Sequence, residues 1–254
     1  MSIFVEADIV AELRADRLIT VGEQYWPGAT LSDAYIWGKV RAAEADAERR
    51  LRVFLEPVEV LPEGGDQGEA DALTAAGTRW ISEPAYDYSP DFFQGEKWGF
   101  VEVRHPPVVS VTSFIFAYPT PENTVWEVDP SWIRVDSKPG YIRLVPTQTP
   151  FYAPLSAYVL SAVGGGRLIP QMLRIRYRSG LVDAANQYPD LVDTVKKMAV
   201  LRIIDDQFVP SSGSISADGL SESMSFDPDH YKKQIDASLE ALRQAIHGVR
   251  VMAV

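Results

Sequence analysis

The sequence predicts an α+β protein, with a helical core and a β-rich middle region of antiparallel strands. Helical periodicity of apolar residues near the start of the chain is the first observation. The second is a stretch from Trp80 to Tyr177 that is rich in aromatic residues, β-branched residues and prolines. The third is the return of helical periodicity after Pro189. Helices are therefore expected near 31–55, 190–208 and 228–247.

Apolar residues in the first long helix recur at steps of three and four, so they share one face: Ile36, Val40, Ala43, Ala47, Leu51 and Phe54. Thr30 or Ser32 is suited to capping the start of this helix, and Asp33 to its first turn. Pro57 is expected to stop it.

The stretch 62–77, "PEGGDQGEADALTAAG", is rich in glycine and acid and has no basic residue, which predicts a mobile loop. Strands are expected in "WGFVEVRH", "VVSVTSFIFAY", "TVWEVDPSWIRVD", "GYIRLVP" and "MLRIRYRSG". "DSKPGY" is typical of a hairpin turn, and "SAVGGGRLIP" of a flexible connection.

The C-terminal part begins with the helix after Pro189 and continues through a small, polar loop over 209–223. Asp227 and Pro228 suit the start of a final amphipathic helix, and Gly248 suits its end. Four parts are expected: an N-terminal helical part (1–61), an acidic flexible loop (62–79), a β-rich region (80–178), and a C-terminal helical part with a docking tail (179–254).

Composition excludes some classes of protein. The chain has no cysteine, so disulfides and thiolate metal sites are excluded. Its first residues lack the basic start and apolar run of a signal peptide, and no apolar stretch approaches the ~18 residues of a spanning helix. We expect a protein made and kept in the cytoplasm unless it joins a larger particle. The net charge of −11 argues against a general DNA-binding protein.

No catalytic motif is found. His105, His230 and His247 do not have the spacing of metal ligands, and they are interpreted as ordinary surface or edge residues. "VGGGRL" lacks the end of a phosphate-binding loop, and no serine elbow is present. We therefore expect no enzyme activity, no catalytic residues, no metal and no cofactor.

Arg174, Arg176 and Arg178 alternate with apolar residues, so strand geometry places the three guanidiniums on one face. This arginine row is either a solvated strand face or a surface that contacts carboxylates of a neighbouring subunit. Contact with DNA is the third interpretation, and the acidic charge of the chain favours it least.

Several stretches together are similar to the head–tail adaptor (connector, or head-completion) proteins of tailed bacteriophages. "LRIRYRSGL…YPDLVDTVKKMAVLRIIDDQF" resembles the C-terminal portion of that family, and "RHPPVVSVTSFIF" its preceding strand. "WIRVDSKPGYIRLVP" resembles its hairpin, with a turn glycine at Gly140, and the helix at 31–55 its first long helix. The resemblance spans roughly 31–208, and the chain departs from it in the acidic loop at 62–77 and the extended β region.

The resemblance implies a structural protein of the virion neck, assembled in the cytoplasm of the bacterial host. Family members form a homo-oligomeric ring, usually twelve-fold, that joins the portal protein to the tail or tail-terminator protein. DNA passes through the channel during ejection without specific binding, and no membrane is involved. An acidic chain suits a channel wall along which DNA slides, because like charges repel.

The resemblance also implies that the C-terminal segment reaches into the portal. The candidate docking residues are apolar ones near and within the last helix: Met224, Phe226, Tyr231, Ile235, Leu239, Leu242, Ile246, Val249, Val251, Met252 and Val254. The alternative is that the last helix packs on the first helix of its own domain, because most amphipathic stripes face a core.

A second function, a β-rich carbohydrate- or ligand-binding module, is prompted by Trp80, Trp98, Trp126 and Trp132. Aromatic residues in strands more often belong to a core.

Overall fold

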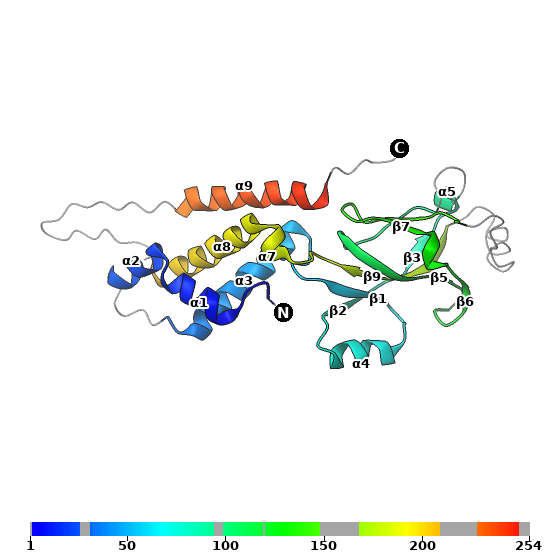
Figure 1. Cartoon of the computed structure of the whole chain (residues 1–254), viewed down its shortest axis with the longest axis horizontal. Helices are drawn as coiled ribbons and strands as arrows, with labels where there is room; N and C mark the ends of the chain where they lie inside the picture. Colours follow the sequence, from blue (N-terminus) through cyan, green and yellow to red (C-terminus); the bar gives the residue numbers. More distant parts are fainter. Residues whose placement is uncertain are drawn as a thin grey trace, which may run out of the picture. The chain divides into compact units, whose positions relative to one another are not determined.

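A computed structural model describes residues 2–25, 31–93, 99–118, 120–147, 168–208 and 228–248. The chain divides into two compact units, one that is mainly 53–182 and one made of 2–52 and 183–245. The first is rich in strands and the second is helical (Figure 1). The predicted α+β class is confirmed.

The larger sheet of the β-rich unit has the strand order β2 (Trp80–Glu83), β1 (Val58–Pro62), β9 (Ile169–Ser179), β5 (Val108–Ala117), β6 (Thr124–Glu127). The short strand β3 (Tyr86–Tyr88) also pairs with β9. β9 is antiparallel to β1, β3 and β5, whereas β1 and β2 are parallel. β9 lies in the middle because its apolar face is fully covered: Leu173, Ile175 and Tyr177 are at most 1% exposed.

A smaller sheet has the order β4 (Val101–Glu102), β8 (Tyr141–Leu144), β7 (Ile133–Asp136). The hairpin predicted from "DSKPGY" joins β7 to β8. Gly140 adopts φ +76° there and donates its N–H to the carbonyl of Asp136 at 3.1 Å. A Cβ at Gly140 would lie 3.0 Å from the side chains of Val103 and Pro106, so glycine is required by both backbone conformation and space. The β-rich unit also contains a short helix α5 (Pro90–Phe93) and a 3₁₀ turn (Pro130–Trp132).

The segment 62–79, predicted to be a mobile loop, instead contains helix α4 (Gln67–Ala75). Asp66 caps it by accepting a hydrogen bond from the N–H of Gly68 at 2.9 Å. Its far end is held by the indole N–H of Trp80, which donates to the hydroxyl of Thr74 at 2.9 Å. Alanine-rich sequence forms a helix readily once its first turn is capped, and three of the four glycines that suggested a loop, Gly64, Gly65 and Gly77, stand outside it.

The helical unit contains α1 (Glu6–Arg14), α2 (Arg17–Tyr25), α3 (Asp33–Leu51), α7 (Ala184–Gln187), α8 (Pro189–Gln207) and most of α9 (Pro228–His247). α3 and α8 pack against one another. The predicted stripe of α3 is buried from Ile36 to Leu51, and Ser32 caps the helix by accepting from the N–H of Tyr35. The helix ends at Leu51, four residues earlier than predicted, because Arg52 adopts the left-handed conformation with φ 55° and closes the last turn.

Packing between α2 and α8 depends on Gly22. A Cβ at this position would lie 2.6 Å from the ring of Phe208, which is itself buried directly after α8. The helices of the unit are also joined at the surface by ion pairs, such as Arg202 with Asp46 at 3.0 Å. Among the described residues, no helix is long and apolar enough to cross a membrane.

Candidate functional site

The arginine row lies on the central strand β9, and two of its three members contact carboxylates of their own chain. The register of β1 with β9 places Glu59 opposite Arg178. The Glu59 carboxylate lies 4.0 Å from Nε of Arg178 and 3.9 Å from Nε of Arg176. Arg176 also forms an ion pair with Glu69 of α4. The row is therefore largely neutralised within the chain, and its contact with a neighbouring subunit stays a prediction.

Arg174 differs from the other two. It is 7% exposed, and its guanidinium donates one hydrogen bond, from Nη2 to the carbonyl oxygen of Pro62 at 3.5 Å. No carboxylate lies within 4.0 Å of it in the described part of the chain. Burial lowers the pKa of Arg174, and the negative charge of Glu122 acts in the opposite direction.

A second polar cluster is buried beside the same strand, around Glu83 at the end of β2. The hydroxyl of Tyr86 donates to Oε1 of Glu83 at 2.6 Å and lies 3.4 Å from the hydroxyl of Tyr177. The backbone N–H of Arg104 donates to the Tyr86 hydroxyl at 2.9 Å. These hydrogen bonds link β2, β3, β9 and the segment after β4.

The other oxygen of Glu83, Oε2, is buried and has no hydrogen-bond partner among the described residues. Nη1 of Arg104 and Nε2 of His105 each lie 3.7 Å from it. Burial raises the pKa of Glu83, although the Tyr86 hydrogen bond and Arg104 counteract this effect. Burial also lowers the pKa of His105, and Arg104 lowers it further. Burial therefore disfavours the charged form of both the Glu83 carboxyl group and the His105 imidazole.

Sequence reasoning missed this cluster, because its members are brought together only by strand pairing. His105 was interpreted as a surface or edge residue, whereas it is half-buried and stacks on Phe54 at 5.3 Å. The sequence contains one indication of the cluster: in "WISEPAYDY", a glutamate stands between strand residues and a proline. The cluster contains no nucleophile paired with a base, and its geometry suits fixing the β2–β3 corner onto β9.

The candidate docking residues on α9 are mostly buried within the chain. Ile235 and Leu239 are 4% exposed, and Leu242 and Ile246 are 1% exposed. Tyr231 is half-buried and lines a hollow of about 200 Å³ with Leu13, Ile204 and other residues of the helical unit. Docking through the stripe would require α9 to leave this surface, so this hypothesis stays a prediction. Met224, Phe226, Val249, Val251, Met252 and Val254 lie outside the described residues.

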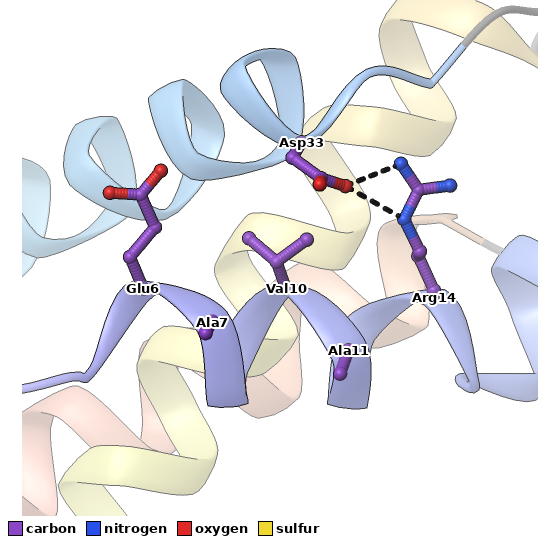
Figure 2. Close-up of a pocket in the computed structure, with 6 residues that line it drawn as sticks. All are labelled: Glu6, Ala7, Val10, Ala11, Arg14 and Asp33. Carbon is purple, nitrogen blue, oxygen red and sulfur yellow. Dashed lines mark hydrogen bonds and ion pairs between the residues drawn. The ribbon is translucent and has the colours of Figure 1, made fainter.

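A larger hollow, of about 550 Å³, lies along α1 (Figure 2). Small and apolar side chains line its middle: Ala7, Val10 and Ala11. Glu6 stands at one end, and at the other both Nε and Nη2 of Arg14 donate to one carboxylate oxygen of Asp33. The arginine and aspartate neutralise one another, and the lining residues include no nucleophile.

Neither a metal centre nor an aromatic binding platform is formed by the residues singled out. No group of three or more metal-ligating side chains occurs among the described residues. Trp132 is 7% exposed, and Trp126 stacks on Phe116 with ring centroids 5.2 Å apart. Trp80 is bound to α4 as described above, and Trp98 lies outside the described residues. Trp126 and Trp132 therefore belong to the core and its edge.

No protein-family model matches the chain, and no curated protein matches it. Among solved structures, the chain is similar to a chain of the neck of an empty GTA particle computed with C6 symmetry, with a TM-score of 0.42 and 16% sequence identity. The similarity covers 96% of this chain and 91% of that chain. A likeness of this size carries no argument about fold or function.

Proposed function

We propose that the chain is a structural protein of the neck of a phage-like particle, forming a ring that joins portal to tail and continues the DNA channel. One observation carries the proposal: the elements of the head–tail adaptor resemblance are present and in order. The long helix α3 comes first, then β5, the β7–β8 hairpin, β9, a segment that contains the short helix α7, and α8, which begins at Pro189. The proposal includes no catalysis, metal or cofactor.

Two further features support a ring. β2 and β6 end the larger sheet in the described part of the chain, and strands at a sheet edge can pair with another subunit. The net charge of −11 suits a channel that DNA must pass without adhering. Twelve-fold symmetry, the portal and tail partners, and assembly in the host cytoplasm are the finer parts of the proposal.

Binding to purified portal rings tests the proposal directly. We expect the chain to co-sediment with portal rings at a fixed stoichiometry and to leave double-stranded DNA unbound at moderate salt. Binding to a glycan array without binding to portal would instead support the carbohydrate-binding alternative. Trp126 and Trp132 do not support that alternative, because both pack against the hydrophobic core.

The arginine row provides a second test. If it contacts a neighbouring subunit, replacing Arg174, Arg176 and Arg178 together by glutamine lowers assembly and flattens its dependence on salt. Arg176→Gln or Arg178→Gln alone changes little, because exposed pairs contribute only ~0.2–1 kcal/mol each. Unchanged assembly and salt dependence in the triple variant would limit the row to pairing within the chain.

A further inference from the structure

Arg174 carries a buried charge that the described part of the chain does not balance. Its guanidinium offers five N–H donors, yet its one hydrogen bond is the 3.5 Å contact with the carbonyl of Pro62. Arg176 and Arg178, on the same strand face, are paired with Glu59 and Glu69. A buried charge is costly unless it is paired and hydrogen-bonded. Of the three arginines on this strand face, Arg174 alone therefore has N–H donors without a carboxylate among the described residues to accept from them.

Two turns flank this guanidinium. In the turn between β1 and α4, a Cβ at Gly64 would lie 3.9 Å from Nη1 and a Cβ at Gly65 would lie 3.7 Å from Nη2. In the turn between β5 and β6, the ring of Pro121 approaches the Gly64 position to 3.2 Å. Glu122, the next residue, raises the pKa of Arg174 through its charge but forms no ion pair with it. The Glu122 carboxylate is therefore too distant to accept hydrogen bonds from the guanidinium of Arg174.

The glycine turn adds donors of its own. Gly64 and Gly65 are exposed, and no backbone hydrogen bond donated by the N–H of Gly64 is found within the described residues. Gly64 has φ +67°, and turns with this backbone geometry form concave surfaces that bind anions. Side chains at these two positions would occupy the space beside the guanidinium.

We propose that Arg174, together with the backbone of Gly64 and Gly65, binds an oxyanion, either a carboxylate or a phosphate. Arginine binds both groups through paired N–H donors, and such charge-assisted hydrogen bonds are stronger than neutral ones. The oxyanion comes either from a free ion or from a carboxylate of a second copy of this chain, which has 35 acidic residues against 24 basic ones.

Inorganic phosphate is the probe for the site. The melting temperature of the full-length chain is measured against phosphate concentration, with sodium chloride holding the ionic strength constant. We expect a saturable rise for the wild type and for Arg178→Gln, the matched control on the same strand. Arg174→Gln weakens phosphate binding at least about tenfold, since hydrogen bonds to charged groups contribute ~1.5–3 kcal/mol. Equal midpoints for Arg174→Gln and Arg178→Gln would overturn the proposal.

A second variant is expected to strengthen phosphate binding, and this test remains valid even if Arg174→Gln fails to fold. Glu122→Gln removes the negative charge beside the site, so phosphate binds about 1.5- to 5-fold more tightly. Glu127→Gln on β6 is the matched control, because Glu127 is also an exposed acid but has no such interaction with Arg174. Equal affinities for these two variants, or no saturable phosphate effect in the wild type, would count against the site.

Assembly distinguishes the two sources of the oxyanion. If a second copy supplies it, saturating phosphate and Arg174→Gln each lower the yield of rings. If a free ion fills the site, phosphate leaves the yield unchanged or raises it. Should the wild type form no ring at all, the proposed function fails, whereas the phosphate titration still tests the site.

Discussion

The stripe on α9 leads to a prediction about Leu239. Leu239 is 4% exposed, and its neighbours in the stripe, Ile235 and Leu242, are 4% and 1% exposed. Truncating a buried leucine to alanine destabilises a protein by ~2–5 kcal/mol, because transfer and cavity effects add. Each kcal/mol lowers the melting temperature of a domain of this size by ~2–4 °C. Leu239→Ala should therefore lower the melting temperature of the 254-residue chain by roughly 4–20 °C.

Thermal unfolding followed by circular dichroism measures this effect. Ser238→Ala is the matched control, since Ser238 is the exposed preceding residue and surface changes of this kind stay within about ±0.5 kcal/mol. Equal melting temperatures for Leu239→Ala and Ser238→Ala would refute the reasoning, because the stripe would then contribute nothing to folding.

Truncation after Phe208 extends the same test. It removes the four buried side chains Ile235, Leu239, Leu242 and Ile246, at ~1.5–3 kcal/mol each, from a total stability of ~5–15 kcal/mol. We expect the truncated chain to unfold or aggregate. A truncated chain that melts like the full-length one but no longer binds portal rings would instead assign the stripe to docking.

Two further predictions concern packing and pH. Gly22→Ala should destabilise the chain by ~1–3 kcal/mol, because its Cβ meets the ring of Phe208 at 2.6 Å. Gly38→Ala in α3, where nothing lies within 4 Å, should stabilise it by ~0.5–1 kcal/mol, and chemical denaturation compares the two variants. Burial holds the pKa of Glu83 above its ordinary 4.5, so its contribution to stability is present below pH 4.5 and is lost as pH rises through the folded-state pKa. The unfolding free energy of the wild type minus that of Glu83→Gln should fall over that range, and a difference independent of pH would contradict the assignment.

Local patterns in the sequence were sufficient for the long elements. The α3 stripe was correctly predicted from Ile36 to Leu51, and Ser32 is one of the two caps that the sequence offered. The apolar face of β9, with Leu173, Ile175 and Tyr177, was also correctly predicted. These features depend on periodicity within one element, which a single sequence contains. The end of α3 was wrong because a left-handed arginine, Arg52, gives no such signal.

Features that depend on pairing between distant segments could not be predicted. α4 is held by its contacts with Trp80 and Arg176, outside its own sequence. The partners of the arginine row follow from the register of β1 with β9, which places Glu59 opposite Arg178. The cluster around Glu83 likewise needs β2, β3 and β9 in place before its polar groups meet.

Mass photometry of the purified chain, alone and mixed with portal rings, tests the central claim most directly. The account predicts particles whose mass is several times 28.2 kDa, and closed rings of the same particles on portal by negative-stain electron microscopy. A chain that stays a 28.2 kDa monomer at every concentration and leaves portal rings bare would contradict it.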